Sequence, residues 1–202
     1  MIILKSNFLF NAIAPIYSLF FKKQRGWFLA AVKIAEGTVN LKKFETALDV
    51  GCGTGAFCSV LDDLGLSTTG IDTASTMIEI AKRKNSGRDI NFIHIDGDSP
   101  FPFVDNSFDI VTSSFVLHGL QKPERYFLYR EMNRVSKNYV IIHDYNDERA
   151  LLTSIIEYLE GGDYFNFIKF AKSEMEEVFS EVEIINVGVR TSWYICKPTY
   201  LE

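Results

Sequence analysis

The stretch Ala-Leu-Asp-Val-Gly-Cys-Gly-Thr-Gly at residues 47–55 constrains the fold more than any other part of the chain. A short apolar run ends in Asp49, and glycines follow at alternate positions, Gly51, Gly53 and Gly55. Glycine adopts positive φ angles without a steric penalty and lets a ligand approach the main chain closely. The pattern therefore predicts a buried strand that turns tightly into a helix beside a ligand. Its spacing differs by one residue from the Gly-x-Gly-x-x-Gly of dinucleotide-binding dehydrogenases.

Strand and helix patterns alternate along the rest of the chain. Apolar strand runs are expected at 47–50, 67–71, 91–95, 108–113 and 139–143, with helices at 56–64, 75–84 and 123–135 between them. Near-continuous apolar strands separated by helices are typical of a parallel sheet covered on both faces.

The end of the chain breaks this alternation. Strand candidates at 182–187 and 192–197 are only four residues apart, too close for a helical crossover, so they should be antiparallel neighbours. We therefore expect an α/β fold: a Rossmann-like three-layer sandwich with a mostly parallel seven-stranded sheet and a C-terminal antiparallel hairpin strand.

Length and charge limit the organisation and the partners. The chain has 202 residues, which predicts a single domain spanning 1–202, with residues 1–40 as an N-terminal helical lid. The formal net charge is -5 and the basic patches are short, so no nucleic-acid partner is expected. The apolar segment from Phe8 to Phe21 is interrupted by Asn11 and Pro15 and is too short to span a bilayer, so no stable membrane insertion is expected.

The three cysteines are Cys52, Cys58 and Cys196. An odd number without paired spacing fits neither a disulfide framework nor a zinc site, so we expect no metal and a reducing cytoplasmic location.

Acidic and polar residues follow the predicted strands. In open α/β sheets ligands bind beyond the carboxyl ends of the strands, which makes these residues the site candidates. Asp72 ends the second strand, 23 residues after Asp49, and its carboxylate can accept both hydroxyls of a ribose. The third strand leads to Asp98, the fourth to His118 and the fifth to His143.

In this order the chain resembles the class I S-adenosylmethionine-dependent methyltransferases, closest to the small-molecule group with the ubiquinone and menaquinone C-methyltransferases. The matching segments lie between about residues 47 and 145: 48–55, 70–72 with Met77, 97–103, 108–111, 117–118 and 131–135. The resemblance implies that S-adenosylmethionine is bound and S-adenosylhomocysteine released. The cofactor contacts it implies are Asp49, Gly51, Cys52, Gly53, Gly55, Asp72, Thr73, Met77, Asp98, Ser99 and Ser114.

Among these, the glycine turn would pass beneath the methionine part, Asp72 would hold the ribose, and Asp98 would bind the adenine amino group. Cys52 is expected to be a small spacer and not a nucleophile.

The implied reaction is in-line SN2 attack of an acceptor on the sulfonium methyl group. A base is needed only where the acceptor must lose a proton, and His118 and His143 are the catalytic candidates, with a purely structural role left open for both. Tyr17 and Tyr164 are the predicted substrate-pocket residues, in two aromatic segments (8–28 and 158–170) that we expect to form a lid. The acceptor is then an aromatic or apolar small molecule.

Two other functions stay open from the residues alone: a non-catalytic S-adenosylmethionine-binding protein and an NAD(P)-dependent oxidoreductase. A monomer and a homodimer are equally compatible with the sequence.

Overall fold

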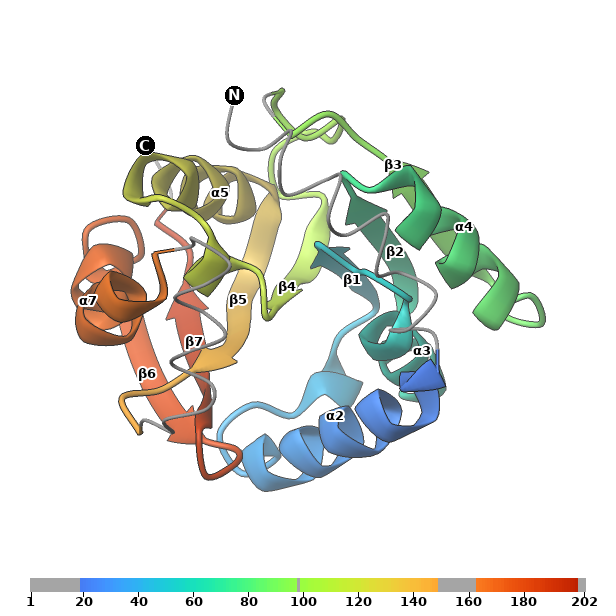
Figure 1. Cartoon of the computed structure of the whole chain (residues 1–202), viewed down its shortest axis with the longest axis horizontal. Helices are drawn as coiled ribbons and strands as arrows, with labels where there is room; N and C mark the ends of the chain where they lie inside the picture. The colour runs from blue at the N-terminus through green and yellow to red at the C-terminus, as the bar shows by residue number, and fades with distance from the viewer. Residues whose placement is uncertain (1–18, 98, 149–162, 200–202) are drawn as a thin grey trace. The chain divides into compact units, whose positions relative to one another are not determined.

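The computed structural model describes residues 19–97, 99–148 and 163–199. Its contacts divide the chain into two compact units, Met1–Pro102 and Phe103–Glu202. Figure 1 labels the helices and strands of both units in chain order.

The first unit alternates helices and parallel strands. Strand β2 pairs in parallel with β1 on one side and with β3 on the other. The elements are α2 (Phe21–Ala35), the short 3-10 helix η1 (Leu41–Lys43), β1 (Thr46–Val50), α3 (Ala56–Asp63), β2 (Ser67–Asp72), α4 (Ser75–Lys84) and β3 (Ile90–His94).

The core of the first unit lies between its strands and helix α3. Leu48 of β1 and Ile71 of β2 are fully buried, as their apolar runs predict. Helix α3 is buried along most of its length, and α2 packs on it through the stacked rings of Phe28 and Phe57, whose centroids are 4.6 Å apart. The packing of α2 on α3 positions the turn from which α3 begins.

The second unit contains both parallel and antiparallel pairs. Strand β5 pairs in parallel with β4 and antiparallel with β7, which pairs antiparallel with β6. The elements are β4 (Phe108–Ser114), the 3-10 helix η2 (Leu117–Gly119), α5 (Lys122–Val135), β5 (Ser136–Tyr145), α7 (Tyr164–Glu176), β6 (Glu181–Asn186) and β7 (Thr191–Lys197).

Helix α5 begins where the sequence predicts a helix start. Pro123 lies in its first turn, where a missing N–H costs nothing. Gln121 and Glu124 form a reciprocal capping box, in which the Gln121 backbone N–H donates to Glu124 Oε2 at 2.7 Å. The helix runs directly into β5, so no loop separates them.

The expected fold class is confirmed: in the described part of the chain, seven strands form a mostly parallel sheet with antiparallel C-terminal strands. The fifth strand is longer than predicted, because Asp144 and Tyr145 continue the ladder opposite Ser192 and Thr191 of β7. Polar residues at that end hide the continuation from a hydrophobicity pattern. Within the described ranges, the helices are all too short or too polar to cross a bilayer.

Candidate functional site

The glycine turn after β1 has the backbone conformation that its sequence predicts. Gly51, Gly53 and Gly55 have φ angles of 70°, 52° and 74°, all in the left-handed region. The N–H groups of Gly51 and Cys52 donate to the carbonyl of Ile71 at 2.9 and 3.0 Å, which ties the turn to the end of β2. Hydrogen bonds to the neighbouring strand β2 therefore fix the position of the turn.

Two of these glycines are required for different reasons. A Cβ on Gly55 would lie 2.7 Å from the Phe92 ring and 2.8 Å from the Asn85 amide, so packing excludes any side chain there. A Cβ on Gly53 would meet nothing within 4 Å. Gly53 therefore leaves open space above its backbone, as a ligand cradle requires.

Asp72, at the end of β2, faces this turn. Its Oδ2 accepts the Gly53 N–H at 2.8 Å and its Oδ1 accepts the Ala74 N–H at 2.8 Å. Burial raises the pKa of Asp72, and these backbone hydrogen bonds oppose the rise. A carboxylate has about four acceptor sites, so Asp72 can accept further hydrogen bonds from a ligand.

Asp49 and the two nearby cysteines form the buried side of the turn. Asp49 is 2% exposed and accepts a hydrogen bond from the Cys58 thiol at 3.3 Å. A Cβ on Gly70 would lie 2.9 Å from the sulfur atoms of both Cys52 and Cys58, so both thiols point into the core. Contact with Cys58 lowers the pKa of Cys52, but burial and the charges of Asp72 and Asp49 outweigh it and raise that pKa to about 11. Cys52 can therefore offer a ligand its backbone but no thiolate.

The other predicted cofactor residues are spread over both units. Met77 is buried in α4, beside Ala74 and Ile80, and Thr73 is half-buried. Ser99 is exposed, and Ser114 ends β4 in the second unit. Asp98 and Tyr17 lie outside the described residues.

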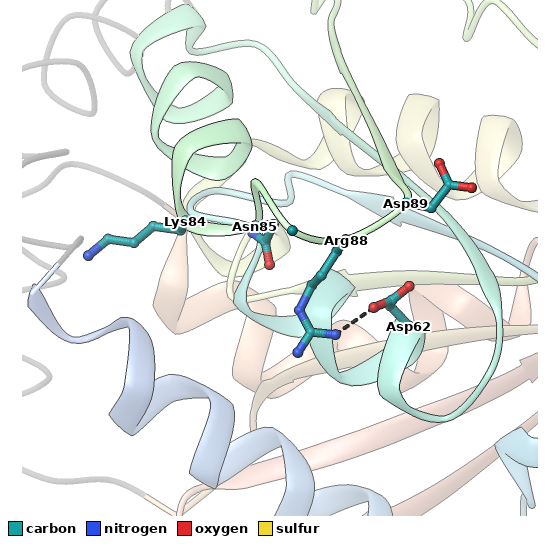
Figure 2. A pocket seen from close by; sticks show the side chains of 6 residues that line it. Asp62, Lys84, Asn85, Arg88 and Asp89 are labelled. Atoms are coloured by element: carbon teal, nitrogen blue, oxygen red, sulfur yellow. Dashed lines mark hydrogen bonds and ion pairs between the residues drawn. The ribbon is translucent and has the colours of Figure 1, made fainter.

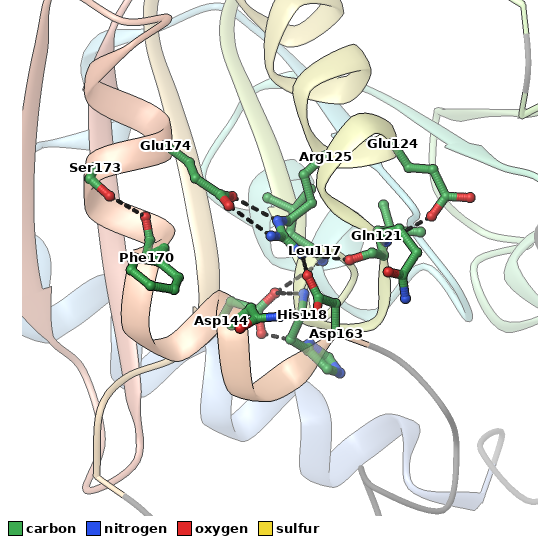
Figure 3. A network of polar contacts seen from close by, with 12 residues as sticks. Leu117, His118, Gln121, Glu124, Arg125, Asp144, Asp163, Phe170, Ser173 and Glu174 are labelled. Atoms are coloured by element: carbon green, nitrogen blue, oxygen red, sulfur yellow. Dashed lines mark hydrogen bonds and ion pairs between the residues drawn. The ribbon is translucent and has the colours of Figure 1, made fainter.

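In the second unit, His118 of η2 is paired with Asp144 of β5 (Figure 3). His118 Nδ1 lies 2.7 Å from Asp144 Oδ1, which also accepts the Tyr145 N–H at 2.8 Å. Asp144 Oδ2 accepts the backbone N–H groups of Leu117 and His118 at 3.1 and 3.3 Å. A carboxylate that is 0% exposed is thus held by three backbone donors and one imidazole.

This arrangement defines what the imidazole can do. Three of the four neighbours of the Asp144 carboxylate are fixed donors, so the ring nitrogen of His118 is assigned as the fourth donor. The Nδ1–H then points to Asp144 and leaves Nε2 with a lone pair. A buried carboxylate on Nδ1 also stabilises the imidazolium that forms when Nε2 takes a proton. An imidazole oriented in this way can accept a proton at Nε2.

Aromatic rings surround this pair. The His118 ring centroid lies 4.8 Å from that of Tyr145 and 6.5 Å from those of Tyr164 and Phe115. Tyr164, a predicted pocket residue, begins α7 and also contacts the Tyr145 ring at 5.2 Å. Phe115 has a φ of 56°, which is unusual for a bulky residue, and is 38% exposed. Strained backbone of this kind is concentrated at functional sites.

His143, the second catalytic candidate, has a different environment. Its side chain is buried in β5, with its ring 4.9 Å from Phe115 and 6.4 Å from Trp193. Burial lowers the pKa of His143 to about 4, although the charge of Asp144 opposes the shift. His143 is therefore neutral at pH 7 and a weak base, so the geometry favours His118.

A buried arginine holds the elements around His118 together (Figure 3). Arg125 of α5 donates to both carboxylate oxygens of Glu174 in α7, each at 2.8 Å, and to Asp163 at 2.9 Å. It also donates to the Leu120 carbonyl, just after η2, at 2.6 Å. Burial alone would lower the pKa of Arg125, but its hydrogen bonds to the two carboxylates outweigh this and raise it. Arg125 thus links α5, α7 and the segment that carries His118.

A surface pocket in the first unit contains none of the predicted site residues (Figure 2). Its volume is about 590 Å³, and in it Arg88 forms an ion pair with Asp62. The residues that line it are Asp62, Lys84, Asn85, Gly87, Arg88 and Asp89.

Sequence reasoning missed Asp144, Tyr145 and Phe115. The signal available for Asp144 was its place after a strand that was expected to end at His143, the same signal that identified Asp72. Its pairing with His118, 26 residues away, depends on where η2 folds back and could not be derived from spacing.

Comparison with known proteins gives consistent matches. A family model described as a methyltransferase domain matches residues 48–142. A demethylmenaquinone methyltransferase of Staphylococcus aureus is 31% identical over 182 residues, covering 76% of this chain and 73% of the relative. A crystal structure of a putative S-adenosylmethionine-dependent methyltransferase from Methanococcus maripaludis aligns with a TM-score of 0.68 and 22% identity, covering 95% of this chain and 94% of the other. Human N-acetylserotonin methyltransferase in complex with SAM has a TM-score of 0.68 and 17% identity, covering 95% of this chain and 59% of the other.

Proposed function

The chain belongs to the class I S-adenosylmethionine-dependent methyltransferases, and we propose that it methylates an apolar, hydroxylated aromatic small molecule, using His118 as the base. S-adenosylmethionine, when bound, supplies an electrophilic methyl group on a positively charged sulfur. Its Staphylococcus relative is named for demethylmenaquinone, and an acceptor of that kind is the one proposed for this chain.

The first unit supports the cofactor part of the proposal. The open backbone at Gly53 and the carboxylate of Asp72 beside it suit a ligand that carries ribose hydroxyls. We assign Asp49, Gly51, Gly53, Gly55 and the backbone of Cys52 to the methionine side. Thr73, Met77, Asp98, Ser99 and Ser114 keep the roles that the family resemblance implies.

The pairing of His118 with Asp144 carries the acceptor part of the proposal. A neutral hydroxyl on an aromatic ring is a poor nucleophile, and loss of its proton makes both the oxygen and the ring carbons more nucleophilic. The proton moves from the acceptor hydroxyl to His118 Nε2, because Nδ1–H is held by Asp144. An amine that is already neutral would not need this base.

The surrounding rings favour an aromatic acceptor. Phe115 and Tyr145 offer ring surfaces beside His118, and aromatic pairs gain about 0.5–1.5 kcal/mol beyond the burial of area. Tyr164 is 1% exposed and packs against the rings of His118 and Tyr145. Of the proposed lid, residues 1–18 and 149–162 lie outside the described part of the chain. The lid, the single functional domain and the pocket role of Tyr17 stay part of this proposal.

We also place the enzyme in the cytoplasm. Cys52, Cys58 and Cys196 are all free and buried, which suits a compartment that keeps thiols reduced.

The test uses matched acceptors. A dihydroxynaphthalene and the corresponding aminonaphthalene are each incubated with S-adenosylmethionine and protein, and S-adenosylhomocysteine formation is measured across a pH series. We expect turnover with the hydroxylated ring that rises with pH, and loss of that rise in His118→Ala. Equal turnover of the amine, or an unchanged pH profile in His118→Ala, would refute the acceptor class and the base.

A further inference from the structure

Helix α2 carries a second apolar side that the described residues of its own unit leave exposed. Phe28, Ala31 and Ala35 are buried on the side that faces α3. Phe20, Trp27 and Ile34 are 48%, 55% and 54% exposed. They are spaced seven residues apart, close to two helical turns, so they lie along one side of the helix. This stripe is too regular to be three isolated surface residues.

Basic residues accompany the exposed stripe. Lys22, Lys23 and Lys33 are exposed on the same helix, and the sequence has no acidic residue between positions 19 and 35. At 3.6 residues per turn, Lys23 lies beside the stripe, whereas Lys22 and Lys33 lie together on the solvent side, roughly 120–140° round the helix from Trp27. Lys23 Nζ lies 5.1 Å from the centroid of the Trp27 ring. We call these six residues, the stripe and the three lysines, the α2 outer face. A cationic face on a chain of net charge -5 is complementary to an anionic partner.

Among the residues that the structure describes, the acids next to α2 are paired with other cations. Asp63 of α3 forms an ion pair with Arg25 at the edge of α2. Glu36, just after the helix, lies 3.9 Å from Lys42 of η1. The lysines of the α2 outer face therefore keep their positive field toward solvent.

We propose that the α2 outer face binds the surface of a bilayer that contains anionic phospholipid. Helices that lie in a membrane interface combine a Trp, Phe or Leu side with lysines on the polar side. Aromatic rings such as Trp27 lie at headgroup level, and lysines extend their ammonium groups to lipid phosphates. The helix lies along the surface and does not cross it.

A second copy of the chain fits this face less well. A symmetric contact places the same patch of both subunits together, so the lysines of the two helices would meet each other. Like charges at a contact are unfavourable, whereas lipid phosphates attract the same groups. The proposal does not depend on the acceptor suggested above.

The two tryptophans make the test direct. Trp27 is 55% exposed and Trp193 is 0% exposed, so a change in fluorescence on vesicle binding reports Trp27. The full chain is mixed with phosphatidylcholine vesicles, or with vesicles that also contain phosphatidylglycerol, without cofactor or acceptor. We expect co-sedimentation, a blue shift and weaker aqueous quenching only with the anionic vesicles.

Charge reversal supplies the controls. Each lysine near an anionic surface contributes about fivefold in binding, so the double variant Lys22→Glu, Lys23→Glu should bind at least about tenfold more weakly. Lys82→Glu with Arg83→Glu, an exposed pair on α4, makes the same charge change and should leave binding intact. Equal losses in both double variants, or no binding by the wild type, would overturn the proposal. A concentration-dependent dimer that Trp27→Ser abolishes would also overturn it, in favour of a second copy.

Discussion

Replacing Asp144 with asparagine tests the proposed base most sharply, because the change keeps the shape of the side chain and alters only its donors and acceptors. The aspartate accepts from Leu117 and His118 N–H on one oxygen, and from Tyr145 N–H and His118 Nδ1 on the other. An asparagine must place its NH₂ group at one of these two positions. Beside Leu117 it would face two fixed N–H donors, whereas beside Tyr145 it would face only one.

The second orientation is therefore favoured, and it switches the His118 ring to its other tautomer. The amide NH₂ donates to His118 Nδ1, which moves the ring proton to Nε2. Nε2 then has no lone pair with which to take the proton of the substrate hydroxyl. General base catalysis contributes about 10²–10⁴-fold, so we expect kcat of Asp144→Asn to fall by that factor, equivalent to about 2.7–5.4 kcal/mol. The unpaired Tyr145 N–H should lower the free energy of unfolding by about 1–3 kcal/mol.

The assay is S-adenosylhomocysteine formation under saturating acceptor, together with urea unfolding and calorimetric titration of S-adenosylmethionine. Cofactor affinity should stay within about twofold, because Asp144 belongs to the acceptor part of the proposal. Asp105→Asn is the matched control: it removes the same charge from an exposed ion pair with Arg134, where the effect on stability should be at most about 1 kcal/mol. Unchanged kcat in Asp144→Asn, with the protein folded, would refute the role of the pair.

Four further outcomes are expected. Asp72→Asn should weaken S-adenosylmethionine binding at least about tenfold by calorimetry, because it loses charge-assisted hydrogen bonds of about 1.5–3 kcal/mol each; unchanged affinity would exclude the ribose role. Gly55→Ala should destabilise the protein by more than about 1 kcal/mol in urea unfolding, because alanine is strained at φ 74° and meets the core; wild-type stability would contradict this. The pKa of His143 is about 4 in the folded protein and 6.5 for the free group, so the free energy of unfolding should fall by up to about 3 kcal/mol as the pH drops from 6.5 to 4. In His143→Gln the free energy of unfolding should fall less over this range; the same pH dependence in both proteins would contradict the lowered pKa. Arg125→Met should lower the free energy of unfolding by about 3–5 kcal/mol, because it leaves the buried Glu174 carboxylate without its partner. Adding Glu174→Leu should restore much of this stability; a double variant whose loss equals the sum of the two single losses would contradict the coupling.

Local patterns were sufficient for most of the fold. Helix α4 spans Ser75–Lys84, as predicted, and most strand ends are shifted by only one residue, because apolar runs and glycine turns are local signals. The last two strands are antiparallel because only a short turn joins them. The fifth strand was underestimated at both ends, since its polar ends are stabilised by pairing with β4 and β7 and not by burial of apolar side chains.

The order of motifs along the chain, through its resemblance to a known family, predicted the cofactor and the family. The glycines at alternate positions and the acids at the ends of the first three strands are chemical requirements of the turn and the ligand, so they can be seen without a structure. The histidines are the opposite case. His118 and His143 have the same intrinsic chemistry, and only the tertiary structure separates them, by burying one in β5 and setting the other against a carboxylate.

The same reason explains Cys52. It lies inside the glycine turn, yet its thiol points into the core, because the space above Gly70 is available to the sulfur. Residue type and spacing decide which groups are present and what the backbone can do. Burial and contacts between residues distant in the chain decide which of those groups are charged, oriented and able to act.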